Sequence, residues 1–271
     1  MTPENEHPVP LVIIVGDSGP VDRNGNQPMM KNNSLRYLAE ALYKNKIASF
    51  RYDKRLVQLI ENRMLNEEDL SFSDFIDDAV AVLNRFKPDR RFSEIYILGH
   101  GQGALVGMAA AQENADGFIS IAGAGQEIGD VIVDQLAVQA PGLMDDARAA
   151  FDDLRTTGQS LNHHSGLASI FRKEIQPFLY TWMQYDPQEE LKKLQMPILL
   201  ITGDKDFQVQ VSELHLLASA NPNAQTVIIE NMNHILKEVD NMGMENQRTY
   251  NNPSLPIIPK LIEVLVDFIN K

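Results

Sequence analysis

Residues Gly99-His100-Gly101-Gln102-Gly103 have the spacing of a nucleophile elbow, with glycine at the central position. Such an elbow is a tight turn between a strand and a helix that lifts the middle side chain above a sheet, and small neighbours relieve the crowding. Glycine has no side-chain atom that can attack a carbonyl carbon, so the covalent acyl-enzyme route is closed at this position. The turn therefore predicts the place of a nucleophile without supplying one.

An acid and a histidine follow this turn along the chain. Asp204 and Asp206 come after the apolar run 198–202, and His234 comes after the next run, 226–230. Nucleophile, acid and base follow one another in this order in one of the known arrangements of a serine triad. His234 would serve as general base and then general acid, while a buried carboxylate orients its ring. Taken alone, Asp206 would be assigned as a helix cap and His234 as a polar loop residue, so their shared order carries the prediction.

Apolar, strand-like runs alternate with amphipathic helical stretches, which indicates an α/β protein whose mostly parallel sheet has helices on both faces. The expected strands are 9–15, 47–52, 94–98, 118–122, 198–202 and 226–230. The expected helices are 35–44, 73–86, 104–112, 211–220 and 256–270. Ser73 is a candidate cap for the second of these helices, and Pro88 ends it.

No strand is evident between Gln126 and about Met196, so we expect a single domain over 1–271 with a helical lid insertion at about 126–196. Ligands of such sheets bind beyond the carboxyl ends of the strands, which helices inserted here would cover. Phe178, Trp182 and Met183 are candidates to line a pocket for an acyl or aryl group. They could also serve only to dock the insertion, because an amphipathic helix needs an apolar face.

The composition of the chain excludes several classes of binding partner. The 271 residues carry a net charge of −13, which repels phosphate backbones and anionic membrane surfaces, so neither nucleic acid nor membrane is an expected partner. The absence of cysteine excludes thiol nucleophiles and thiolate metal sites. We expect no metal and no cofactor. The first ten residues lack a basic flank and a long apolar run, which predicts a cytoplasmic protein if the chain begins at Met1 and leaves export open if an upstream segment precedes it.

Longer motifs at several positions belong to one pattern. They are 16–25 (GDSGPVDRNG), 51–55 (RYDKR), 185–187 (YDP), 203–209 (GDKDFQV) and 233–234 (NH). Through them the chain resembles bacterial serine esterases and acyl hydrolases of the α/β-hydrolase superfamily. The family has serine where this chain has Gly101, and it usually carries additional N-terminal strands.

That resemblance implies a protein related to carboxylic-ester hydrolases, with a small acyl or aryl ester as its ligand. It implies Asp206 as the triad acid, with Asp204 as the alternate, and His234 as the base. The oxyanion hole would be formed by backbone N–H groups of Gln102 and Ser18. With Gly101 at the nucleophile position, serine-esterase activity is expected to be absent or strongly reduced.

Three functions remain open for such a site. The first is a hydrolase-family protein crippled at Gly101, and the second is chemistry in which His234 and Asp206 activate water without a covalent step. The third is a non-catalytic protein that holds a small ligand. Ser18 is a poor substitute nucleophile because its expected place is beside the oxyanion hole.

The sequence Gly99-x-Gly101-x-x-Ala104 also matches a dinucleotide-binding fingerprint. That fingerprint belongs on the first strand of a nucleotide-binding unit and needs an acid at the end of the following strand. Here the following strand ends in residues 123–125 (GAG), which disfavours the assignment. The adjacent pair His163 and His164 is expected to be exposed, and Asp53, Lys54 and Arg55 to form a structural charge network.

Overall fold

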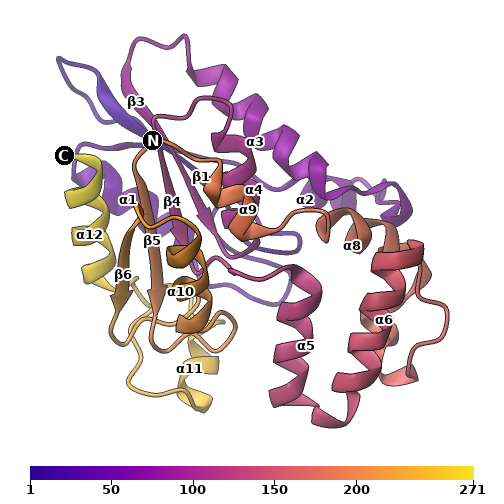
Figure 1. Ribbon diagram of the computed structural model, residues 1–271. Helices are drawn as coiled ribbons and strands as arrows, with labels where there is room; N and C mark the ends of the chain where they lie inside the picture. Colours follow the sequence, from indigo (N-terminus) through magenta and orange to yellow (C-terminus); the bar gives the residue numbers. More distant parts are fainter.

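The computed structural model describes residues 1–271 and contains one six-stranded sheet with the strand order β2-β1-β3-β4-β5-β6 (Figure 1). The strands are β1 (Val9–Val15), β2 (Ala48–Arg51), β3 (Phe92–His100), β4 (Gly117–Ile121), β5 (Ile198–Gly203) and β6 (Gln225–Ile229). Every neighbouring pair is parallel. Parallel neighbours need crossover connections, which the helices supply.

Helices cover both faces of the sheet. One face carries α1 (Ser34–Lys44) and α12 (Pro259–Ile269), and the other carries α3 (Phe72–Phe86), α4 (Gln102–Ala111), α9 (Pro187–Lys192) and α10 (Val211–Ala220). Two short helices, α2 (Arg55–Glu61) and α11 (Met244–Thr249), lie in the loops that follow β2 and β6. None of the helices is long and apolar enough to cross a membrane.

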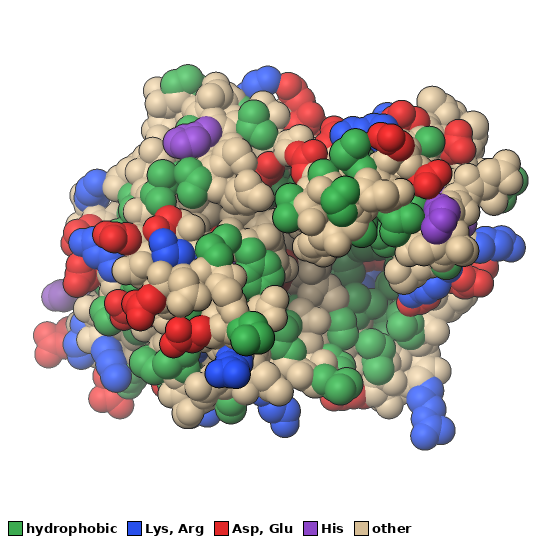
Figure 2. All heavy atoms as spheres, turned by 90° about the horizontal axis from the view of Figure 1, so that it is seen from below, with side chains coloured by type: hydrophobic (Ala, Val, Ile, Leu, Met, Phe, Trp, Pro, Cys, Tyr) green, Lys and Arg blue, Asp and Glu red, His purple; other side chains and the backbone are tan.

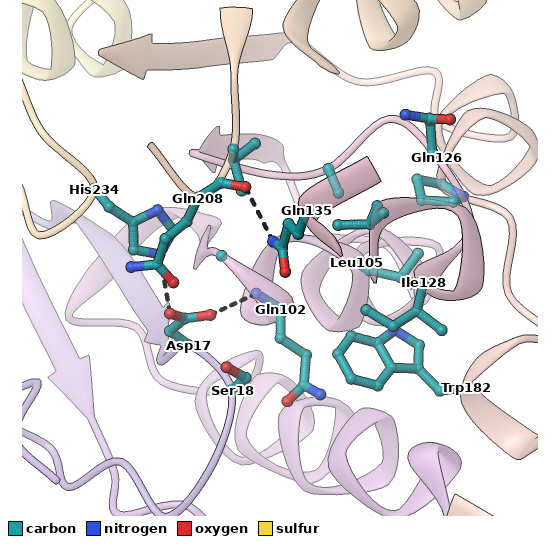
Figure 3. A pocket seen from close by; sticks show the side chains of 15 residues that line it. Asp17, Ser18, Gln102, Leu105, Gln126, Ile128, Gln135, Trp182, Gln208 and His234 are labelled. Atoms are coloured by element: carbon teal, nitrogen blue, oxygen red, sulfur yellow. Dashed lines mark hydrogen bonds and ion pairs between the residues drawn. The ribbon is translucent and has the colours of Figure 1, made fainter. Parts of the chain in front are cut away.

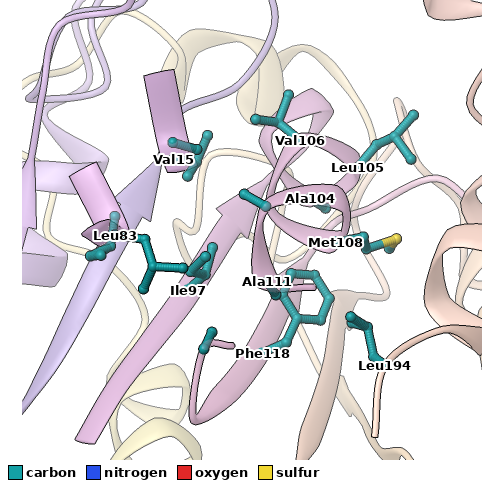
Figure 4. Close-up of a cluster of buried hydrophobic side chains, with 14 of the residues drawn as sticks. Val15, Leu83, Ile97, Ala104, Leu105, Val106, Met108, Ala111, Phe118 and Leu194 are labelled. Atoms are coloured by element: carbon teal, nitrogen blue, oxygen red, sulfur yellow. The ribbon is translucent and has the colours of Figure 1, made fainter. Parts of the chain in front are cut away.

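Burial on both faces explains why the central strands are continuous apolar runs. In β1 every residue from Leu11 to Val15 is buried, because α1 packs from one side and α3 and α4 from the other. Figure 4 shows the cluster between the sheet and α4, where Ala104, Met108 and Ala111 meet Ile97 and Phe118. Small residues on α4 let this helix approach the sheet closely, which fixes the turn that precedes it.

The structure confirms the predicted α/β architecture, the mostly parallel sheet and the helices on both faces. The expected strands and long helices occur with ends shifted by a few residues. The expected cap of α3 is wrong: the helix begins at Phe72, and Ser71 forms a capping box with Asp74, whose carboxylate accepts the Ser71 N–H at 2.8 Å. Ser71 caps the helix in place of Ser73 because only Ser71 has an acid three residues later.

Residues 126–196, named here the helical insertion, connect β4 to β5 and contain no strand. Besides α9, the helices are α5 (Ile128–Gln139), α6 (Met144–Thr157), α7 (Ala168–Phe171) and α8 (Gln176–Trp182). Its own small core includes Phe151 and Phe171. Trp182 stacks on Phe72 of α3 with ring centroids 5.4 Å apart, so α8 is tied to the body of the molecule.

Candidate active site

The strand order reverses direction between β1 and β3, which makes the carboxyl ends of these strands the switch point of the sheet. The loop after β1 carries Asp17, and the turn after β3 carries Gly101. Loops after β5 and β6 bring Asp206 and His234 to the same edge. Four loops far apart in the sequence therefore meet where a doubly wound sheet binds its ligand.

The turn at Gly101 has the predicted form. Strand β3 ends at His100, helix α4 begins at Gln102, and Gly101 between them has φ +55° and ψ −122°. A Cβ atom at Gly99 would lie 2.1 Å from the Gly103 carbonyl oxygen, so the small flanking residues are required by close backbone approach. The elbow frame read from the sequence is a real strand-turn-helix in which position 101 faces the converging loops.

Asp206 and His234 form a buried pair, each 3% exposed. The Nδ1 atom of His234 lies 2.7 Å from Oδ2 of Asp206, and Oδ1 of Asp206 accepts the N–H groups of Gln208 and Val209. One carboxylate therefore orients the imidazole and also closes the turn before α10. Asp204 points elsewhere, because its carboxylate accepts the Asn231 N–H and pairs with a lysine.

The loop that carries His234 is held by an amide network. The Asn233 side chain donates to Oδ1 of Asn246 at 2.9 Å and to Oγ1 of Thr249 at 2.8 Å, and it accepts the Lys237 N–H. His100 donates from Nε2 to the His234 carbonyl oxygen at 2.7 Å. Helix α11, which the sequence did not reveal, thus holds the loop of the histidine, and His100 at the end of β3 fixes it from the other side.

Asp17 is the site residue that the sequence reasoning missed. Its Oδ2 accepts a hydrogen bond from Nε2 of His234 at 3.0 Å, and its Oδ1 accepts the Gln102 N–H at 2.9 Å (Figure 3). The carboxylate therefore accepts from both donors that an acyl-transfer site would use: Nε2 of the histidine and the N–H of the residue after the elbow. The available signal was an acid at the end of the first strand, in the loop expected to line the oxyanion hole.

Two carboxylates on one imidazole decide the charge of the site. Burial acts to lower the pKa of His234, but the charge of Asp206 and the hydrogen bonds to Asp17 and Asp206 raise it to about 10. Burial acts to raise the pKa of Asp17, yet its hydrogen bond and ion pair with His234 hold that pKa far below its usual range. Both pKa directions favour an imidazolium on His234 that donates to the Asp17 carboxylate.

A buried lysine bonds both Asp17 and Gln102. Lys54 is 3% exposed and donates from Nζ to the Asp17 carbonyl oxygen at 2.7 Å and to Oε1 of Gln102 at 2.6 Å. Its ammonium group lies 4.5 Å from the Phe75 ring centroid. Burial lowers the pKa of Lys54 to about 8. Lys54 therefore ties the loop after β1 to the start of α4, while its neighbours Asp53 and Arg55 form ion pairs with Arg23 and with two acids of α3.

Ser18 and Gln102, the residues predicted to form an oxyanion hole, both line the cleft. The N–H of Gln102 points to the site and is taken by Asp17. Ser18 is exposed and lines the same cleft, and its carbonyl oxygen accepts from Nε2 of Gln27 at 3.0 Å. A role for the Ser18 N–H as second donor stays a prediction.

The cleft above these residues holds about 590 Å³ of space, part of it open to solvent. In Figure 2 the surface is hollowed between two lobes, with hydrophobic side chains gathered around the hollow. The helical insertion supplies one wall through Ile128, Val131 and Trp182, and three glutamine side chains add amide groups: Gln126, Gln135 and Gln208. The cleft fits a small, mostly apolar molecule with a few polar groups.

A second pocket lies on the other side of Ser18, Gln102 and Trp182, which line both spaces. Its wall is mainly apolar and includes Phe178. Trp182 and Phe178 thus line pockets and also dock the insertion. Met183 does not line either pocket: it is 8% exposed and packs in the core of the insertion. Its side chain lies with those of Phe151, Phe171 and Leu179, so it serves the core of the insertion.

The chain resembles a known esterase in sequence. Esterase EstD of Thermotoga maritima is 28% identical over 250 residues, which cover 86% of this chain and 56% of the relative. The chain thus spans about half the length of the curated relative it matches. No model of a known protein family matches the chain.

Solved structures share the fold. Est1E from Butyrivibrio proteoclasticus with ferulic acid bound has a TM-score of 0.60 at 17% identity, covering 100% of this chain and 94% of that one. An esterase from Pyrococcus furiosus has a TM-score of 0.57 at 13% identity, covering 98% and 83%. The fold is therefore that of the α/β hydrolases, and the relative that the chain resembles in sequence is an esterase.

Proposed function

We propose that this chain is an esterase-related α/β-hydrolase that keeps the acid, the base and the substrate cleft of an acyl-transfer site but has lost serine-esterase activity. The observation that carries the proposal is the elbow itself. Gly101 sits at the tip of the turn, beside the Asp206–His234 pair, and offers no atom that could form an acyl-enzyme. In a well-studied protease, loss of the nucleophile alone costs on the order of a million-fold in turnover.

The ligand that the cleft supports is a small acyl or aryl ester or a related uncharged compound. Its walls combine aromatic and aliphatic side chains with the amides of Gln126, Gln135 and Gln208, which suits an apolar body with one or two polar groups. The helical insertion would act as a lid over that ligand, because Trp182 reaches from α8 into the wall of the cleft. These features support binding independently of turnover.

Ligand binding without chemistry is the second candidate function, and Asp17 favours it over water activation. A general base must offer a free lone pair to water, whereas Nε2 of His234 carries a proton that is donated to Asp17. Chemistry by His234 and Asp206 alone would require this contact to open first.

The test is an assay of the native chain with p-nitrophenyl acetate and p-nitrophenyl butyrate, next to His234→Ala. We expect both proteins to release nitrophenol at the same rate, close to the rate in buffer without protein, because no nucleophile is present. Binding of p-nitroacetophenone, an uncharged aryl compound that cannot be hydrolysed, is followed by NMR and should saturate in both proteins and weaken in Trp182→Ala. Turnover that saturates with ester concentration and disappears in His234→Ala would overturn the proposal in favour of water-mediated hydrolysis.

A further inference from the structure

The carboxylate of Asp17 makes the contacts that the substrate and nucleophile of an esterase would make. Oδ1 accepts the N–H of Gln102, the predicted oxyanion donor, at 2.9 Å, and Oδ2 accepts from Nε2 of His234 at 3.0 Å. A bound carboxylate product would offer the same two oxygens to the same two donors. Figure 3 shows Asp17 between His234 and the start of α4, at the floor of the cleft.

Asp17 and a side chain at position 101 compete for one space. A Cβ atom built on Gly101 would lie 2.0 Å from Oδ1 of Asp17 and 2.4 Å from its Cγ, well inside van der Waals contact. The other glycines of the elbow are crowded by backbone instead, as at Gly103, where a Cβ would meet the Val15 carbonyl oxygen at 2.4 Å. The clash at position 101 is therefore specific to the Asp17 side chain.

The backbone of Asp17 is held in position by the side chain of Lys54. Lys54 donates to the Asp17 carbonyl oxygen, and the same ammonium group bonds the Gln102 side chain, so the loop after β1 and the first turn of α4 share one buried anchor. Only side-chain rotation of Asp17 could free the site. Rotation would break two charge-assisted hydrogen bonds, which are about twice as strong as neutral ones.

We propose that Asp17 is an internal ligand of the site: its carboxylate fills a subsite for a small monocarboxylate anion and replaces the missing serine side chain, so that residues 17 and 101 depend on each other. This inference rests on the proposed function. It predicts that a serine at position 101 gains reactivity only when Asp17 is shortened. It also predicts that shortening Asp17 alone opens the subsite to external carboxylates.

The subsite is tested by titrating acetate and benzoate into the native chain, Asp17→Gly, Asp17→Asn and Asp53→Asn. The last is a matched control, because it removes a carboxylate from the neighbouring loop that touches Arg23 and not His234. The readout is the imidazole resonances of His234 by NMR. We expect saturable shifts with both anions in Asp17→Gly only, since the amide introduced by Asp17→Asn still fills the space. Equal shifts in the native chain and Asp17→Gly, or none in either, would contradict an occupied carboxylate subsite.

The dependence between positions 17 and 101 is tested by a cycle of four proteins: native, Gly101→Ser, Asp17→Gly and the double variant. With p-nitrophenyl acetate we expect the double variant to exceed both single variants by about 100-fold or more, against the million-fold scale of nucleophile loss. Circular dichroism of each variant checks that it is folded.

The outcomes separate the two proposals. If Gly101→Ser alone matches the double variant, Asp17 does not block the site, and the further inference fails while the hydrolase scaffold stands. If the folded double variant binds p-nitroacetophenone as the native chain does but shows no hydrolysis above Asp17→Gly, the retained acid and base are not competent, and the proposed function fails. Gain confined to the double variant supports both.

Discussion

The two sides of the site differ in what they retain. On the late-strand side, after β5 and β6, Asp206 and His234 keep the geometry of a catalytic acid and base at 2.7 Å, braced by α11. On the early-strand side, after β1 and β3, Gly101 lacks a nucleophile and Asp17 occupies the space instead. The comparison shows that the Asp206–His234 pair is complete on one side of the site, while on the other side position 101 has no side chain and a carboxylate takes its space.

The largest expected effect tests whether the late-strand side is still functional. In the double variant Asp17→Gly/Gly101→Ser, adding His234→Ala should reduce ester hydrolysis by about 10⁴-fold or to background, because the serine then lacks a base. Steady-state rates with p-nitrophenyl acetate measure this. A triple variant as active as the double would show that the retained pair contributes nothing.

The charge on His234 gives a pH dependence of stability. Its folded pKa of about 10 lies above the ordinary 6.5, so its pairing stabilises the fold fully below pH 6.5 and is lost as pH rises through about 10. Asp17, with a depressed pKa, contributes stability that is present above pH 3.8 and lost in stronger acid.

Asp17→Asn should therefore flatten the alkaline part of this profile. Without the Asp17 charge the pKa of His234 falls, and less stability remains to be lost between pH 6.5 and 10. Urea denaturation at a series of pH values measures both curves. Parallel curves for the native chain and Asp17→Asn would indicate that Asp17 is not paired with His234 in solution.

Lys54→Met tests how much the buried lysine, which links the loop after β1 to the start of α4, contributes to stability. The substitution keeps the apolar stem over Phe75 but leaves the Asp17 carbonyl oxygen and Oε1 of Gln102 without their donor. We expect a loss of about 3 kcal/mol in the free energy of unfolding, because buried acceptors lose charged partners. Chemical denaturation monitored by Trp182 fluorescence gives the value, and a change below about 1 kcal/mol would show that the anchor is dispensable.

The smallest expected change in stability comes from the exposed ion pair between Asp53 and Arg23, near the loop after β1. Asp53 pairs with Arg23, whose side chain is 58% exposed, so Asp53→Asn should change stability by no more than about 1 kcal/mol. The same denaturation experiment measures it, and added salt should shrink the difference further. A loss as large as that of Lys54→Met would mean that the exposed ion pair, and not the buried lysine, holds the loop.

Much of the fold was predictable from the sequence because buried parallel strands and amphipathic helices have strong periodic patterns. Strand β1 and helix α10 match their predicted ranges. Helices α2 and α11 were missed because they are short and partly polar, and α11 is fixed by side-chain bonds from Asn233 that no local pattern encodes.

The site was predictable where chain order carries information. Gly101, Asp206 and His234 follow the order expected of strand-end loops in a parallel sheet, and the structure brings them together. Asp17 was not predictable, because the direction of its side chain depends on the close approach of β1 to β3. Met183 shows the opposite failure, since an apolar residue on a helix can face the core of the insertion as readily as the cleft.

The most direct measurement of the central claim is labelling with a fluorophosphonate probe, which reacts with activated serines, followed by mass spectrometry of the intact chain and its peptides. We expect the native chain to stay unmodified, the Asp17→Gly/Gly101→Ser variant to gain one adduct at position 101, and His234→Ala in that background to abolish it. A stoichiometric adduct on the native chain, at Ser18 or any other residue, would show that a nucleophile is present and would contradict the account.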